Sequence, residues 1–410
     1  MAVSNVNFTA STFSYGNNPT NSTTFIDTML KFLVSGGDPL GIEKIVVTDG
    51  VARVTTSEKN FNSVPGVKFI LNGTNNEKID GRIEIQSIFL DGFSFNTEAV
   101  NATFTNGLTY AISPLGWSLI SRTSTKFVIK SGPSAETPFF MIFENVNDYW
   151  LHYISYNYDE IAPSTKKYPK ISVINYNIVF GIRGDANIAS TTSYKYWMYG
   201  DDAFFILSSI FNLDATEPKG RDSNFNKLNI SSFGELTGYQ DGPQFHFLSG
   251  YYMSTIPAGV GDSFLSNVGT GQLLSNVSIA SNFVYGCKTV NGYPLHGWCK
   301  PAKLITNTGS GTLRLYASGS FIFQKTPFYV PNYITNNDNV IIGRIPGSIL
   351  IDGSFEQGLF SPLLPFKFSM GQMKNKNFVC VNANKAANGS FSSTLTDSCF
   401  SLLNLSGPIR

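Results

Sequence analysis

The sequence contains little charge. Only 14% of its 410 residues are Asp, Glu, Lys or Arg, against about 25% in an average soluble protein. The formal net charge is +1, which gives no electrostatic reason to bind nucleic acid, so we expect no such partner. Neutral surface can be covered by another protein subunit without desolvating ions, and we therefore expect broad contacts between subunits.

Histidine is also scarce. His152, His246 and His296 are the only three, and none forms the HxxH, HxxxH or HExxH spacing of a helical metal site. Alternation in a strand would point His246 away from the neighbouring rings of Phe245 and Phe247. We expect His246 to be a surface or hydrogen-bonded structural residue, and no catalytic residue is assigned.

Four cysteines, Cys287, Cys299, Cys380 and Cys399, form no CxxC pair. Cys287, His296 and Cys299 would give only three zinc ligands, where four are usual. We expect unlinked buried thiols, with a disulfide or a zinc site as weaker alternatives. No metal or other cofactor is predicted.

Long apolar runs are missing, so membrane insertion is not expected. The polar segment from Met1 to Tyr15 lacks the apolar core of a signal peptide, which predicts a protein that stays in the cytoplasm where it is made.

Signatures of enzymes are missing as well. Glycine patterns for dinucleotides, phosphates or a nucleophile elbow are incomplete. Asp201 and Asp202 are the best pair of carboxylates, but neighbours on a strand point to opposite faces, and Gly200 before them favours a hairpin turn. We predict that the protein is not an enzyme. Glycosidase carboxylates leave no local signature, so a glycan hydrolase stays an alternative.

Neutral polar and aromatic residues are abundant instead: 38 Asn, 45 Ser, 32 Thr, 34 Phe and 19 Tyr. One segment, residues 24–37, has helical periodicity and ends at two glycines, which predicts a short amphipathic helix over 24–35. Its apolar stripe is Ile26, Met29, Leu30 and Leu33.

Almost everything after that helix has the alternation of strands, bounded by turn residues. Ile83 and Ile85 alternate with polar neighbours, and residues 139–143 are typical of a strand buried on both faces. We predict a mainly β protein of two or three β-sandwich or barrel-like domains with one short N-terminal helix. The expected domains are residues 1–120, 121–260 and 261–410.

The carboxyl end is unusually apolar, with Leu402, Leu403 and Leu405 before the turn at Gly407-Pro408. We predict a docked final strand, which closes the chain's own sheet or extends that of a neighbouring copy. The candidate assembly residues are therefore Ile26, Met29, Leu30, Leu33, Leu403, Leu405 and Arg410.

Several segments, in order, resemble structural proteins encoded among the tail genes of long-tailed bacteriophages and prophages. Residues 45–110 match poorly. The matching segments are the helix at 25–36, Pro114-Leu115-Gly116-Trp117 with the strand 126–129, Gly200-Asp201-Asp202-Ala203-Phe204-Phe205-Ile206-Leu207, Phe233-Gly234-Glu235 with Gly242, Arg344-Ile345-Pro346-Gly347, and Leu403 to Arg410.

The resemblance implies a tail-associated virion protein: a baseplate, tail-tip or fibre-anchoring subunit that is made in the host cytoplasm. Its partners would be copies of itself, in a ring or trimer, and other phage tail proteins. A carbohydrate-binding protein that recognises a host surface glycan is the first alternative, and a glycan hydrolase is the second.

Overall fold

The structure is a computed structural model. It describes residues 6–14, 23–58, 61, 63–146, 149–158, 170–171, 177–180, 193–211, 228–238, 244–249, 251–253, 283–288, 294–301, 303–304, 314–315, 329–336, 340–352, 366–367, 377–382 and 399–405.

The protein is mainly β, as predicted, and its larger sheets are antiparallel. The largest sheet has, in order, β1 (Asn7–Ser14), β16 (Ser193–Gly200), β17 (Phe204–Phe211), β18 (Leu228–Glu235), β19 (Phe245–Ser249), β21 (Phe283–Lys288), β22 (Pro294–Pro301), β25 (Tyr329–Asn336), β26 (Ile341–Asp352), β29 (Cys399–Asn404), β28 (Asn377–Asn382) and β27 (Phe366–Lys367). It therefore contains both the first and the last strand of the described chain.

A second sheet lies beside it. Its order is β10 (Ser118–Arg122), β11 (Lys126–Lys130), β12 (Phe140–Val146), β13 (Tyr149–Ser155), β15 (Asn177–Phe180) and β20 (Tyr251–Met253), with β14 (Lys170–Ile171) also paired to β13. In β12, Met141, Ile142 and Phe143 are all fully buried, so the strand predicted to be covered on both faces is confirmed. A short parallel pair, β23 (Lys303–Leu304) and β24 (Arg314–Leu315), stands apart.

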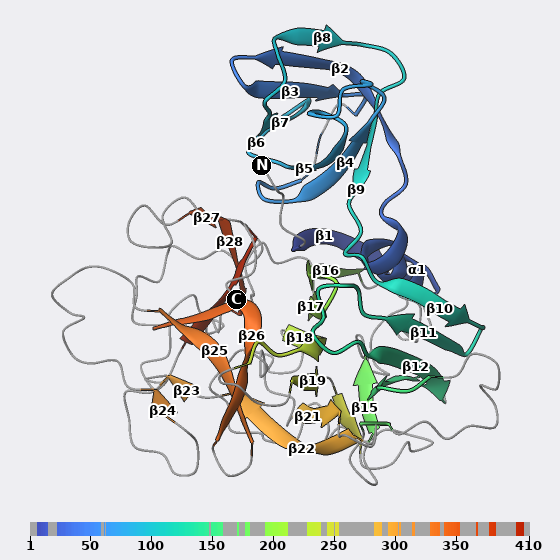
Figure 1. Ribbon diagram of the computed structural model, residues 1–410, viewed down its shortest axis with the longest axis vertical. Helices are drawn as coiled ribbons and strands as arrows, with labels where there is room; N and C mark the ends of the chain where they lie inside the picture. Colours follow the sequence, from blue (N-terminus) through green and yellow to red (C-terminus); the bar gives the residue numbers. More distant parts are fainter. Residues whose placement is uncertain are drawn as a thin grey trace, which may run out of the picture.

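The third sheet is built from residues 40–112 and curls into a barrel-like unit, called the barrel below. Its order is β5 (Gly81–Glu84), β4 (Lys68–Asn72), β9 (Thr109–Ile112), β2 (Leu40–Thr48), β3 (Val51–Thr56), β7 (Gly92–Asn96) and β6 (Ser87–Phe89), with β8 (Ala102–Phe104) paired to β2. The two end strands, β5 and β6, are consecutive in the chain, so the sheet bends back on itself. In Figure 1 the barrel stands above the remaining sheets, called the body below.

The predicted helix is present as α1 (Thr23–Leu30), which continues as one π-helical segment, η2 (Lys31–Ser35). It ends at Gly36, which has the positive φ expected of a glycine stop, +80°, but whose ψ of 173° differs from that of a left-handed helical cap. All four stripe residues are at most 6% exposed and lie within the chain's own core. No helix among the described residues is long and apolar enough to span a membrane.

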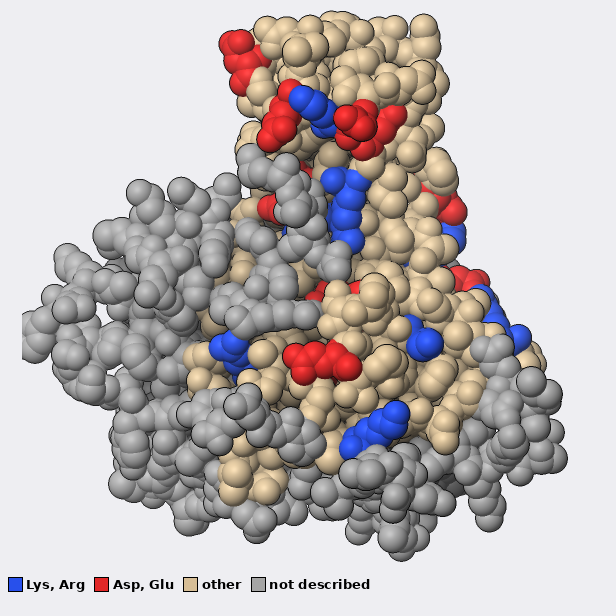
Figure 2. Space-filling model, viewed as in Figure 1, with Lys and Arg blue, Asp and Glu red and all other residues tan. Residues whose placement is uncertain are grey.

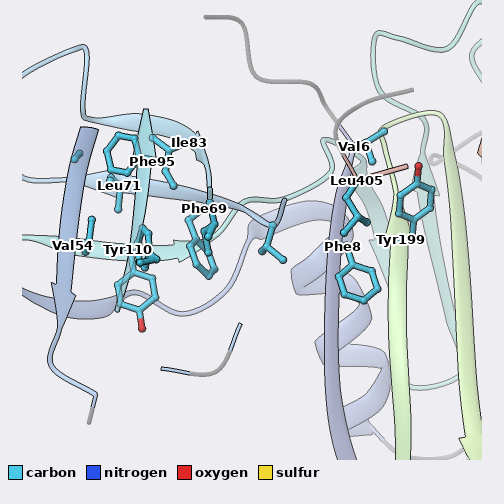
Figure 3. Close-up of a cluster of buried hydrophobic side chains, with 14 of the residues drawn as sticks. Val6, Phe8, Val54, Phe69, Leu71, Ile83, Phe95, Tyr110, Tyr199 and Leu405 are labelled. Carbon is cyan, nitrogen blue, oxygen red and sulfur yellow. The ribbon is translucent and has the colours of Figure 1, made fainter. Parts of the chain in front are cut away.

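The strands β16 to β19 separate two hydrophobic cores, because alternate side chains point to opposite faces. Phe204 and Ile206 face a core shared with the barrel, whereas Phe205 and Leu207 face a core shared with the helix and the second sheet. Figure 3 shows Val6, Phe8, Tyr199 and Leu405 grouped on the body side of the first core, with barrel side chains such as Phe69 beyond them. The predicted limits of the three domains stay a prediction.

Candidate functional site

The turn between β16 and β17 is the centre of a buried polar site. Gly200 pairs with Phe205, and the main-chain N–H of Asp201 donates to the oxygen of Phe204 at 3.0 Å. The Oδ1 of Asp201 accepts from the N–H groups of Ala203 and Phe204 at 2.8 and 3.1 Å. The predicted hairpin is thus confirmed, and the Asp201 carboxylate serves the turn itself.

The Leu-Gly-Trp segment packs directly on this hairpin. The indole Nε1–H of Trp117 donates to the main-chain oxygen of Asp201 at 2.7 Å. Asp202 is 2% exposed and its Oδ2 accepts from the N–H of Ser134 at 3.1 Å. A Cβ on Gly132 would lie 2.5 Å from the Asp202 side chain, so only glycine fits there.

The helix end is bound to the same segment. The N–H groups of Gly116 and Trp117 both donate to the oxygen of Leu33 at 3.1 Å, and the N–H of Leu115 donates to Phe32 at 3.0 Å. These bonds satisfy carbonyl groups that a helix terminus leaves without an intrahelical partner. The helix and the hairpin are therefore held by one short segment.

The Phe-Gly segment closes the other side of the hairpin. The N–H of Glu235 donates to the oxygen of Ala203 at 2.9 Å. Gly234 has φ +142°, and a Cβ there would lie 2.3 Å from the Cα of Phe204. The glycine is needed because the two strands approach closely at this point.

The Arg-x-Pro-Gly turn and the last strand also meet the hairpin. The hydroxyl of Tyr199 donates to the main-chain oxygen of Asn404 at 2.8 Å. A Cβ on Gly347, which has φ +65°, would lie 2.2 Å from that hydroxyl oxygen. Burial raises the pKa of Tyr199 well above its ordinary value, so the hydroxyl is a neutral donor.

These contacts define one unit, the hairpin junction: residues 199–205 with residues 32–33, 115–117, 132–134, 233–235, 347 and 404. Nearly all the segments that carry the resemblance to phage tail proteins contribute to it. The poorly matching residues 45–110 all belong to the barrel, which contributes no residue to this unit. Sequence reasoning found the segments but not their contacts.

His246 is a hydrogen-bonded structural residue, as expected. It is 0% exposed, and its Nδ1 lies 2.7 Å from the Tyr156 hydroxyl. Its Nε2 is 3.7 Å from Oε2 of Glu235, whose two oxygens also accept from the N–H groups of Glu136 and Thr137. Burial lowers the pKa of His246 although Glu235 acts in the opposite sense, so the ring is neutral.

Of the four cysteines, only Cys287 has a side chain among the described residues. The Cys287 thiol is buried and burial raises its pKa. The side chains of Cys299, Cys380 and Cys399 lie outside the described residues, as does Arg410. Among the residues that the structure describes, no group of three or more His, Cys, Asp or Glu is placed to hold a metal ion.

The final strand lies in the chain's own sheet, which is the first of the two predicted alternatives. Leu403 pairs with Ser348 of β26 and Val379 of β28, so β29 is an interior strand. Leu405, just beyond it, is 1% exposed. Whether these residues also serve assembly between subunits stays a prediction.

The barrel carries a cavity of about 490 Å³. It is lined by residues 77–80, 82–84, 86 and 95–98, which include four carboxylates and two cations. Arg82, Glu84 and Gln86 line it from one face of β5 and the residues after it. The alternation of these three with Ile83 and Ile85 was visible in the sequence, but their common cavity was not.

Arg82 also connects the barrel electrostatically to the hairpin junction. Burial lowers the pKa of Arg82, and the negative charges of Asp202 and Asp201 act in the opposite sense. Charged side chains are otherwise sparse over the described surface seen in Figure 2, in line with the composition.

Similarity to known proteins gives little basis for assigning this chain to a family. No family model and no curated protein matches the sequence. Among solved structures, the phage phi92 endosialidase aligns with 87% of this chain and 76% of its own, at 10% identity and a TM-score of 0.18. At that TM-score, a shared fold is not shown.

Proposed function

We propose that the chain is a structural subunit of a bacteriophage tail, which acts by assembling with other proteins and not by catalysis. The observation that carries this proposal is the hairpin junction. Segments that resemble tail proteins, from the helix to the last strand, contact one another around residues 199–205. These segments, although far apart in the sequence, form one folded unit, and this supports reading their resemblance together.

The chemistry of the junction, and of His246 beside its Glu235, supports a structural role. Asp201, Asp202, Glu235 and His246 are all at most 7% exposed. Each is within hydrogen-bonding or ion-pair distance of other parts of the chain, and each stabilises a turn or a strand end. A catalytic acid or base must instead reach a substrate.

The test is the composition of purified particles. Phage particles are purified on a density gradient from a host that carries the gene. They should contain the chain in a fixed number of copies per tail, measured by quantitative mass spectrometry. Immunogold labelling should then place it on the tail. Labelling on the head alone, or absence of the chain from infectious particles, would contradict the proposal.

The oligomeric state is part of the same proposal. Low charge and many neutral polar side chains favour interfaces of more than ~1,000 Å², which suit a closed ring or trimer. Light scattering of the purified protein should give a trimer or a larger closed assembly. A monomer in solution that is also isolated in the particle would refute this part.

Carbohydrate binding is the second candidate function, because the barrel cavity has the size of a small-molecule site. Saturation-transfer NMR with host surface oligosaccharides tests it, with Glu77→Gln and Glu98→Gln as variants of two exposed carboxylates that line the cavity. Loss of the transferred signal in both variants would favour recognition of the carbohydrate by this cavity. Newly formed reducing ends in the same samples would indicate a hydrolase.

A further inference from the structure

The barrel is an insertion in the body. The chain enters it after η2 and leaves it after β9, and the two connections lie side by side, since the N–H of Gly37 donates to the oxygen of Ile112 at 3.0 Å. A unit attached through two adjacent strands can change its orientation unless another contact fixes it. The contacts beyond these connections therefore decide how rigidly the barrel is held.

Lys68, the first residue of β4, makes such a contact. It is 0% exposed, and its Nζ donates to the main-chain oxygen of Leu405, 337 residues away. Glu84, on the neighbouring strand, lies 3.4 Å from the same nitrogen. The charge of the buried Lys68 is balanced by the carboxylate of Glu84, and its ammonium group donates a hydrogen bond to the carbonyl of Leu405.

Leu405 is itself fixed to the body. Its N–H donates to the oxygen of Asn377 at 2.7 Å, and the preceding residue, Asn404, accepts from the Tyr199 hydroxyl. On the barrel side, a Cβ on Gly66 would lie 3.0 Å from the Cβ of Leu405. The end of β29 is therefore enclosed between barrel and body.

The first strand reaches the same point. The amide of Asn7 donates to the oxygens of Lys68 and Ser113 at 3.1 and 2.8 Å, and its Oδ1 accepts from the N–H of Lys68 at 2.9 Å. Asn7 and Lys68 are both 0% exposed. The two ends of the described chain thus flank one buried lysine.

We infer that residues 404–405 are a strap that fixes the barrel on the body, and that Lys68 is its anchor on the barrel. The strap lies at the end of the last described strand, so the contact between Lys68 and Leu405 forms only when that strand has entered the sheet. The charged groups that face the anchor are Glu84, which favours its charge, and Arg82, which opposes it. Burial has the largest effect and lowers the pKa of Lys68 to about 8.

Two truncations of the full chain test the strap. Both carry a carboxy-terminal amide, so that neither places a new carboxylate beside Lys68 or Tyr199. A protein that ends at Asn404 lacks the Leu405 oxygen and side chain, whereas a protein that ends at Leu405 keeps both. The N–H of Lys68 donates to Asn7 and the N–H of Ser113 donates to the oxygen of Lys68, so both lie beside the anchor. Hydrogen exchange at these two groups should be at least tenfold faster in the first protein. The second protein should exchange at these groups as the full chain does.

Amides inside the barrel are the internal control. The ladder between β2 and β3, where Ile45 pairs with Val54, should stay protected in both truncations. Equal loss of protection there would mean that the barrel unfolds, and unchanged exchange at Lys68 and Ser113 would mean that the strap holds nothing. Either result would overturn the inference.

The anchor is tested separately by Lys68→Met, which keeps an unbranched side chain one atom shorter and removes the donor. The proposal requires the same faster exchange at Ser113 as in the shorter truncation, again with the β2–β3 ladder protected. If exchange at Ser113 is unchanged in Lys68→Met, Lys68 is not the anchor.

Discussion

The indole nitrogen of Trp117 donates a hydrogen bond of 2.7 Å to the main-chain oxygen of Asp201, 84 residues further along the chain. The bond joins the segment that packs on the end of the helix to the hairpin that precedes β17. Both residues are at most 2% exposed, so water cannot replace the bond if the indole is removed. The hairpin junction therefore depends on this contact in a way that can be measured.

Trp117→Phe should destabilise the protein by about 1–3 kcal/mol more than the loss of ring size alone, because the Asp201 oxygen is left buried without its donor. Trp150→Phe is the matched control. Trp150 is 7% exposed, and its Nε1 has no hydrogen-bond partner among the described residues. Denaturant unfolding of both variants gives the difference, and equal losses would show that the bond contributes nothing.

Gly347→Ala should be among the most damaging small changes in the chain. The new Cβ would meet the Tyr199 hydroxyl and push it away from Asn404, in addition to the cost of a positive φ. Gly107→Ala separates the two effects, since Gly107 has φ +67° and open space around its Cβ. We expect Gly347→Ala to cost about 1–3 kcal/mol more. Similar melting temperatures for the two variants would contradict the clash.

The helix stripe should behave as core within a single chain. Leu33→Ala removes a fully buried side chain and should cost about 2–5 kcal/mol. Lys31→Ala, two residues earlier, breaks only an exposed ion pair with Asp38 and should change stability by less than ~1 kcal/mol. Calorimetry on dissociated subunits measures the melting temperature of both variants. If the stripe were buried only by a neighbouring subunit, both variants would melt at the same temperature.

Local patterns in the sequence predicted the elements that depend on local physics. The stop at Gly36, the hairpin at Gly200 and the strand through Phe143 each follow from a few neighbouring residues. The side of its strand on which His246 lies, opposite Phe247, also follows from simple alternation. Such features need no knowledge of distant contacts.

The anchor of the strap could not be predicted in this way. Lys68 opens the strand Lys68–Asn72, whose three central residues are apolar, and a lysine at a strand end is usually exposed. Its burial depends on Asn7 and Leu405, which are 61 and 337 residues away. The barrel as an inserted unit was missed for the same reason, because strand alternation does not say which sheet a strand joins.

Lys68 should also leave a signature in the pH dependence of stability. Burial lowers its pKa to about 8 in the folded protein, whereas the unfolded chain has the ordinary value of 10.5. Below pH 8 the lysine is protonated in both states, and the full penalty of burying the charge is present. Between pH 8 and 10.5 the unfolded state binds more protons, so the contribution of Lys68 to stability rises with pH.

The expected gain is about 3.5 kcal/mol for the full difference between the two pKa values, at about 1.4 kcal/mol per pH unit, and about 3 kcal/mol of it falls between pH 7 and 10.5. It is measured as the difference in unfolding free energy between the wild type and Lys68→Met at pH 7 to 10.5, because the buried tyrosines titrate alike in both proteins. The difference should move in favour of the wild type as the pH rises. A difference that is flat, or that moves the other way, would mean that Glu84 and solvent together offset the effect of burial, and would contradict the lowered pKa of Lys68.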